Sequence, residues 1–159
     1  MINKRAFVPK TGQTTQYRAE DDGALQKGVA NPSPRFTDNG NGTVTDNLTG
    51  LMWIKNPDAT VRTWNDAVDY CSNLTTAGGH TDWHLPNLRE LQSLIDYQNF
   101  NTALPTGHPF IGVQTIYYWS ATTHAGSTAA AWYLRMNDGF ADFGVKTGAM
   151  GVWPVRGGQ

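Results

Sequence analysis

The stretch that decides the fold is AWYLRMNDGFADFGV, residues 131–145. Its centre is the step Asp138-Gly139, which has alternating residues on both sides. An Asp-Gly pair in this setting favours a two-residue type I′ turn, because both central positions of that turn need positive φ. We therefore predict a β-hairpin with its turn at Asp138-Gly139.

Counting outward from this turn predicts which residues of the two strands face each other. Arg135 is expected opposite Asp142, and Leu134 opposite Phe143. Since side chains alternate across a strand, one side of the hairpin should be core and the other a mixed polar and aromatic surface. The expected core side holds Trp132, Leu134, Met136, Ala141, Phe143 and Val145, and the outward side holds Tyr133, Arg135, Asn137, Phe140, Asp142 and Gly144.

Two interpretations of the outward side are open at this point. Tyr and Arg are frequent in binding hot spots because they combine a large contact area with directed hydrogen bonds, which favours a surface made for contact. A half-buried hairpin with a cross-strand ion pair between Arg135 and Asp142 explains the same residues. The hairpin residues alone do not decide between the two.

Length and charge restrict the classes of protein that fit. The 159 residues are the size of one domain. The 12 basic and 13 acidic residues give no electrostatic basis for binding nucleic acid or an anionic membrane. No segment suits membrane insertion, and the first residues do not form a signal peptide. Display on a virion surface, or on a cell surface reached by another route, is compatible with this sequence.

The first half of the chain predicts an arm followed by strands. Residues 1–34 are polar and rich in Gly, Gln and Pro, and we expect an extended arm that lies on the domain or tethers it. In the domain, residues 35–159, segments 35–37 and 43–45 flank a Gly/Asn cluster typical of a hairpin loop. The apolar run 51–54 suits a central strand.

Two helices are expected between these strands and the C-terminal hairpin. Thr63 is a good N-cap for a helix whose apolar residues recur on one face. Asn87, with Glu90 three residues later, has the capping-box pattern at the start of a second helix. The order strands, helices, strands predicts an α+β fold with two helices packed on an antiparallel sheet.

No pattern of catalytic or metal-binding residues is evident in the sequence. His80 and His84 are four apart, but they lie in an expected loop without a third ligand nearby. A nucleophile elbow and a Gly-rich phosphate loop are both missing. Cys71 is the single cysteine, and its spacing favours a small core residue. We therefore expect no enzyme activity, no metal and no cofactor.

Six motifs follow one another along the chain: FTDNGNGTVTD at 36–46, TGLMW at 49–53, DWHLPN at 82–87, YWS at 118–120, AW at 131–132 and VWPVR at 152–156. In this order they resemble the DUF1566 family, the domain at the C-terminus of the Legionella collagen-like adhesin. The resemblance spans residues 8–157. One departure is His84, where the family motif usually has Arg.

The resemblance implies a C-type lectin fold, of the variety shared with formylglycine-generating enzyme. It also implies that residues 51–54 lie near residues 152–156 and close the sheet. Many members of the family are variable proteins of diversity-generating retroelements, in which adenine-directed mutagenesis rewrites codons near the C-terminus. In this chain the segments 118–123 and 152–156, among others, match the fixed frame of such a cassette.

The positions between the fixed residues, taken with the outward side of the hairpin, are the expected ligand-binding set. Phe143 belongs to this set although the hairpin register places it inward, and a bulge after Asp142 would reconcile the two. The set is Ser127, Ala129, Ala130, Tyr133, Arg135, Asn137, Asp138, Phe140, Asp142, Phe143, Gly144, Gly148, Ala149 and Met150.

The implied function is a non-enzymatic domain that presents a diversified C-terminal surface to a protein or glycan ligand on another cell or particle, as in viral or phage host attachment. One alternative is a fixed-specificity adhesin for sulfated polysaccharide, which would need a basic surface, whereas the cassette offers Arg135, Lys146 and Arg156. Another is a formylglycine-generating-type oxidase, which relies on a pair of cysteines. The sequence indicates neither the ligand nor the oligomeric state.

Overall fold

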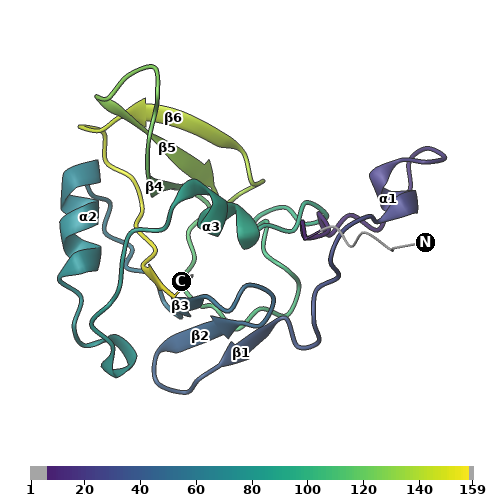
Figure 1. Cartoon of the computed structure of the whole chain (residues 1–159), viewed down its shortest axis with the longest axis horizontal. Helices are drawn as coiled ribbons and strands as arrows, with labels where there is room; N and C mark the ends of the chain where they lie inside the picture. Colours follow the sequence, from purple (N-terminus) through teal and green to yellow (C-terminus); the bar gives the residue numbers. More distant parts are fainter. Residues whose placement is uncertain (1–6, 158–159) are drawn as a thin grey trace.

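The computed structural model describes residues 7–157 as two antiparallel sheets with helices beside and between them (Figure 1). Residues 1–6 of the predicted arm and 158–159 of the predicted domain lie outside this description. The α+β class is confirmed, but the strands form two sheets where one was expected. The first sheet has the order β1 (Phe36–Asp38), β2 (Thr43–Asp46), β3 (Met52–Ile54), β7 (Val155–Arg156), and the second has β4 (Tyr117–Thr123), β5 (Ala130–Arg135), β6 (Ala141–Val145).

Both predicted helices are present with their predicted caps. The Thr63 hydroxyl accepts a hydrogen bond from the backbone of Asp66 at the start of α2 (Trp64–Ser72). Asn87 and Glu90 form a complete capping box at the start of α3 (Leu88–Ser93). A short helix, α1 (Asp22–Leu25), lies in the arm, and a 3₁₀ turn spans Ala77–Gly79. In Figure 1, α3 lies between the two sheets, α2 along one side, and α1 at the far end of the arm.

The first sheet closes through the pairing that the family resemblance implied. β3 and β7 are antiparallel, with Trp53 opposite Val155. Trp153, directly before β7, packs edge-on against Trp53 and Phe110, at ring-centre distances of 5.8 and 4.9 Å. Its indole N–H donates to the Ile54 carbonyl at 2.8 Å. This aromatic group lies in the larger of two buried clusters, to which strands of both sheets and α3 contribute.

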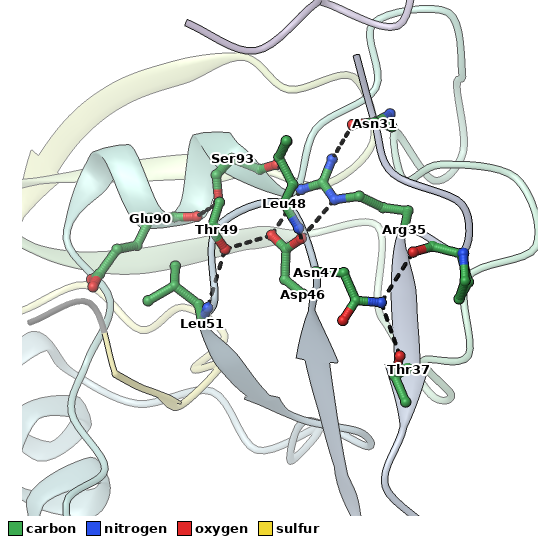
Figure 2. Close-up of polar contacts among 11 residues, drawn as sticks. Asn31, Arg35, Thr37, Asp46, Asn47, Leu48, Thr49, Leu51, Glu90 and Ser93 are labelled. Carbon is green, nitrogen blue, oxygen red and sulfur yellow. Dashed lines mark hydrogen bonds and ion pairs between the residues drawn. The ribbon is translucent and has the colours of Figure 1, made fainter. Parts of the chain in front are cut away.

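A buried ion pair joins the end of the arm to the first sheet (Figure 2). The Arg35 guanidinium donates to both carboxylate oxygens of Asp46, at 2.7 and 2.8 Å, and to the Ser93 carbonyl at 2.8 Å. Asp46 has no exposed side-chain area and also accepts from the Leu48 backbone and the Thr49 hydroxyl. Each oxygen of this buried carboxylate therefore accepts two hydrogen bonds, one from Arg35 and one from the turn at Leu48-Thr49.

The C-terminal hairpin forms, but the predicted two-residue turn is wrong. Leu134 pairs with Ala141 instead of Phe143, which shifts the register by two residues. The connection is the longer loop Met136–Gly139, closed by the Arg135 N–H donating to the Phe140 carbonyl at 2.8 Å. Met136, the first residue of this loop, is buried in the core.

Gly139 holds the loop against the rest of the domain. It has a φ of +78°, and a Cβ at this position would lie 2.6 Å from Cγ2 of Ile95, just after α3. Only glycine fits both this conformation and this close approach. Asp138 is not among the residues with positive φ, as a type I′ turn would have required.

A shift of two residues leaves every strand side chain on its predicted side, whereas a shift of one would have reversed them all. The predicted core side is buried only near the loop, at Leu134 and Met136. Toward the other end of the hairpin, Phe143 is 44% and Val145 63% exposed, because the core does not extend that far. The expectation of a fully buried side was wrong for these two residues.

Candidate ligand-binding face

The outward side of the hairpin continues onto β4. Tyr117 of β4 pairs with Arg135 of β5, and Tyr133 of β5 pairs with Asp142 of β6. Together with Phe140, which follows the loop, these residues form one partly exposed surface. We call the surface made by Tyr117, Tyr133, Arg135, Phe140 and Asp142 the Arg135 face.

Arg135 is held in place from three directions. Its guanidinium forms an ion pair with Asp138, with Nε to Oδ1 at 2.9 Å. It lies 5.4 Å from the ring centre of Phe140 and 5.9 Å from that of Tyr117, within range of cation–π attraction. The predicted cross-strand pair of Arg135 with Asp142 is wrong, since the register places Asp142 opposite Tyr133.

Arg135 and Asp138 each stabilise the charged form of the other, and Asp138 also stabilises the loop. The Arg135 guanidinium lowers the pKa of Asp138, and Asp138 in turn raises the pKa of Arg135. Oδ1 of Asp138 also accepts from the Phe140 backbone at 3.1 Å. Asp138 therefore fixes both the loop and the orientation of the arginine above it.

Aromatic rings form the centre of the face. Tyr133 packs edge-on against Tyr117 at 4.9 Å and against the buried Trp119 at 6.1 Å. Partial burial, followed by the nearby charge of Asp142, raises the pKa of Tyr133. The ring therefore stays protonated in the neutral range and can donate a hydrogen bond to a ligand or accept one.

The other predicted positions spread along the hairpin. Gly144 and Met150 lie beside Tyr133: a Cβ at Gly144 would be 3.1 Å from Tyr133 and 3.3 Å from Met150. Asn137 lies in the hairpin loop, where its side-chain amide bonds to Asn101. Toward the opposite end of β5, Ser127, Ala129 and Ala149 are exposed and Gly148 is partly exposed.

Two predicted positions do not belong to this face. Ala130 is buried, with 5% exposure, so its side chain is not part of this exposed surface. Phe143 lies on the other side of the sheet, with its ring stacked on His124 at 3.9 Å and edge-on to Trp132 at 5.7 Å. The predicted bulge after Asp142 does not occur, since the β5–β6 register is continuous and the irregularity lies in β4.

A family model for the Lcl C-terminal domain, the DUF1566 family, matches residues 42–156. The chain belongs to this family. Membership indicates an adhesin-like or surface domain. The matched range contains the whole Arg135 face and leaves out the arm and β1. A search of curated proteins finds no match.

Tyr117 is the residue of this Lcl domain face that sequence reasoning missed. It stands at the beginning of β4, and only the pairing of β4 with β5 brings it to Arg135. The alternation of Tyr117-Tyr118-Trp119 was a usable signal, because it predicts opposite sides for the neighbouring residues Tyr117 and Tyr118.

Concave sites of the Lcl domain lie elsewhere. A cleft of about 510 Å³ is lined by arm residues and by the loops around Arg35 and His108, and no residue of β4, β5 or β6 lines it. Within residues 7–157 no group of three or more His, Cys, Asp or Glu side chains is arranged to hold a metal ion. None of the helices described has the length and apolar character of a membrane span. The Arg135 face is thus a surface rather than a pocket.

Proposed function

We propose that this Lcl C-terminal domain is a non-enzymatic binding domain whose Arg135 face receives a protein or glycan ligand. The observation that carries this proposal is the placement of Arg135, which is held over Tyr117 and Phe140 with 35% of its side chain exposed. A fixed arginine among exposed rings loses little conformational entropy when it binds. Aromatic and arginine side chains of this kind dominate binding hot spots.

We propose further that the face is diversified, as in the variable protein of a diversity-generating retroelement. The difference in burial between the fixed-frame residues and the residues of the Arg135 face supports this proposal. The fixed-frame residues Trp119, Met136 and Trp153 have no exposed area, whereas Phe140 and its neighbours on the face are exposed to different degrees. Substitution of partly exposed residues on a rigid scaffold usually changes stability little, so such a face tolerates variation.

The scaffold that we propose for this surface is a C-type lectin fold. The antiparallel pairing of β3 with β7 supports it, as does the position of a C-terminal hairpin after two helices. A diversified surface on such a scaffold suits recognition of a ligand on another cell or particle. Host attachment by a virus or phage, or adhesion by a protein displayed on a cell, would both use it in this way.

The direct test replaces Arg135, Phe140 and Asp142 together with alanine and measures binding to a glycan array and to a display library of surface proteins. We expect the triple variant to remain folded and to lose the interactions of the wild-type protein. The matched control replaces Lys55 and Asp38, an exposed pair on the first sheet, and should bind as wild type does. Binding that is unchanged in the triple variant would place the ligand elsewhere.

Diversification has a test of its own in the neighbouring DNA. A near-copy of the codons for residues 117–156, differing at adenines and lying beside a reverse-transcriptase gene, is the expected finding. Without such a repeat the face would have one specificity, and the binding proposal would stand without the diversification.

A fixed-specificity adhesin for sulfated polysaccharide is the weaker alternative. Its three cationic candidates are all occupied: Arg135 by Asp138, Arg156 by Asp82 at 2.7 Å, and Lys146 by the Trp64 ring at 3.8 Å. Ion pairs of this kind reduce the free positive charge that a polyanion needs. Retention on heparin that falls steeply with salt would favour this alternative over ours.

An oxidase mechanism at Cys71 has little support. The thiol lies on the buried side of α2, and desolvation raises its pKa to about 12. A cysteine in this state is a poor nucleophile, since the thiolate is the reactive form. We therefore assign Cys71 to the second buried cluster, where it packs with Ala67, Trp119 and Val152.

A further inference from the structure

Strand β6 is the outer strand of the second sheet, and its free edge can be derived from the hydrogen bonds of its inner edge. Arg135 N–H donates to the Phe140 carbonyl, and Lys146 N–H donates to the Ala129 carbonyl. Hydrogen-bonded and non-bonded pairs alternate along an antiparallel ladder. The first, third and fifth residue pairs counted from Arg135–Phe140 toward Ala129–Lys146 are therefore non-bonded pairs.

Those non-bonded pairs include Ala141, Phe143 and Val145 on β6. Their main-chain N–H and C=O groups point away from β5. The Phe143 N–H has only a local acceptor, the carboxylate of Asp142 at 2.8 Å, and the Val145 carbonyl accepts from Gly148 in the next turn. No strand within residues 7–157 pairs with this edge, which leaves a template for another strand.

We propose that β6 pairs antiparallel with β6 of a second copy of this chain, about a twofold axis at Phe143. The two strands then form one continuous sheet. A twofold interface requires a self-complementary surface, and β6 has one. In this register Phe143 faces its own counterpart, Ala141 faces Val145, and Asp142 faces Gly144.

The outward groups satisfy one another in this arrangement. Each Phe143 N–H leaves the Asp142 carboxylate and donates to the Phe143 carbonyl of the other copy, and Val145 N–H donates to the Ala141 carbonyl. Asp142 faces glycine, so no charged residue stands directly opposite a like charge, which would oppose pairing. A strand of unrelated sequence would form the main-chain hydrogen bonds with this edge but would lack the matching side chains.

Side chains favour the same partner. Phe143, His124 and Trp132 form a partly exposed aromatic cluster on one side of the sheet. A twofold axis at Phe143 brings two such clusters together and covers them. Because the strand is short, the interface is small, and we expect a weak dimer that forms only as the concentration rises.

This pairing goes beyond the proposed ligand binding and does not depend on it. Ala141 and Val145 are outside the candidate variable set, and Phe143 lies on the other side of the sheet from the Arg135 face. Variation of the Arg135 face therefore leaves the edge bonds intact. The twofold axis is perpendicular to the sheet, so the dimer presents two Arg135 faces on the same side.

Charge placed on the axis tests the register. Phe143→Lys puts two lysines opposite each other, and Phe143→Glu puts two glutamates there, so each variant alone should remain monomeric. An equimolar mixture should form a dimer of one copy of each. Analytical ultracentrifugation of the ligand-free chain, from low to high micromolar concentration, measures all three samples beside wild type. Phe140→Lys, a charge on the hairpin but away from the axis, is the matched control and should dimerise as wild type does.

Three results would overturn the proposal: a wild-type protein that stays monomeric throughout the range, charged variants that dimerise like wild type, or a mixture that fails to recover the dimer. Amide hydrogen exchange of wild type gives a second measure without any substitution. Rising concentration should protect the N–H groups of Phe143 and Val145 and leave those of Asp142 and Gly144, already bonded to β5, unchanged. Neither measurement uses a ligand, so failure here leaves ligand binding untouched.

Discussion

The two sheets carry the same kinds of group in opposite environments. The first sheet contains an arginine–aspartate pair, Arg35 with Asp46, of which at most 9% of either side chain is exposed, and the buried aromatic group around Trp153. The second contains the pair of Arg135 with Asp138 and the partly exposed group around Phe143. Burial, not residue type, separates a structural element from a surface available to a ligand.

This difference has a direct energetic meaning. A buried charge that loses its partner leaves an unpaired ion in a medium of low dielectric constant, whereas an exposed charge returns to water. The buried pair and the buried aromatic group of the first sheet should therefore be intolerant of change, and the partly exposed residues of the second sheet should be tolerant. Four measurements test this difference.

The largest effect is expected from Trp153→Ala. It removes the indole that packs on Trp53 and Phe110 and leaves a cavity at the centre of the core, and such substitutions cost about 4 kcal/mol of unfolding free energy. Chemical denaturation monitored by circular dichroism measures it. Trp132→Ala, in the partly exposed aromatic group, is the comparison and should cost much less. Equal losses would contradict the distinction between the sheets.

Arg35→Ala should be nearly as damaging. It leaves the buried carboxylate of Asp46 without its cation, and breaking a buried pair in this way costs about 3 kcal/mol. Asp46 keeps its bonds from Leu48 and Thr49, so the carboxylate is not wholly unsatisfied and the loss should fall at the lower end for such pairs. A denaturation midpoint close to that of wild type would show that the pair is dispensable.

The next largest effect is expected at His84, which should make the free energy of unfolding depend on pH. Its Nε2 is 3.3 Å from both carboxylate oxygens of Glu90. Glu90 raises the pKa of His84, and Asp82 raises it by a smaller amount. The charged histidine thus stabilises the fold fully below its ordinary pKa of about 6.5, and this contribution disappears as pH rises through the higher folded-state pKa. The side chain is 43% exposed, so solvent screening limits the effect to about 1 kcal/mol or less.

Two variants isolate this contribution. His84→Gln should be less stable than wild type at acidic pH and equal to it at alkaline pH. His84→Arg, the residue usual in the family motif, should retain the ion pair throughout the range. Thermal unfolding of the three proteins across pH measures the differences, and a constant gap between wild type and His84→Gln would rule out the ion pair as its cause.

The smallest effect on stability is expected from Arg135→Ala. Its ion pair with Asp138 is exposed to solvent, where such pairs contribute little. We expect no measurable change in the denaturation midpoint, together with loss of ligand binding. A clear destabilisation would mean that the arginine holds the hairpin loop and would favour the structural interpretation of the face.

Local patterns predicted the elements of this fold well. The hydroxyl of Thr63 and the capping box of Asn87 act within one turn of the helix they start, so their effect does not depend on distant residues. The sides of the hairpin were also predicted, because the observed register differs from the predicted one by two residues, and an even shift keeps the alternation of both strands in step. The pairing of β3 with β7 joins segments far apart in sequence, and only the family resemblance anticipated it.

Tertiary structure decided the rest. Alternation along each strand, together with a connecting loop of an even number of residues, was enough to place Arg135 and Phe140 on one side, since extended backbone turns each successive side chain by half a revolution. The loop length, the ionic partner of Arg135 and the contribution of Tyr117 depended on other parts of the chain. Burial of Met136 and the contact of Gly139 with Ile95 after α3 outweighed the local preference of an Asp-Gly step, because buried apolar contacts at a close-packed junction are worth more than the choice between two turn geometries.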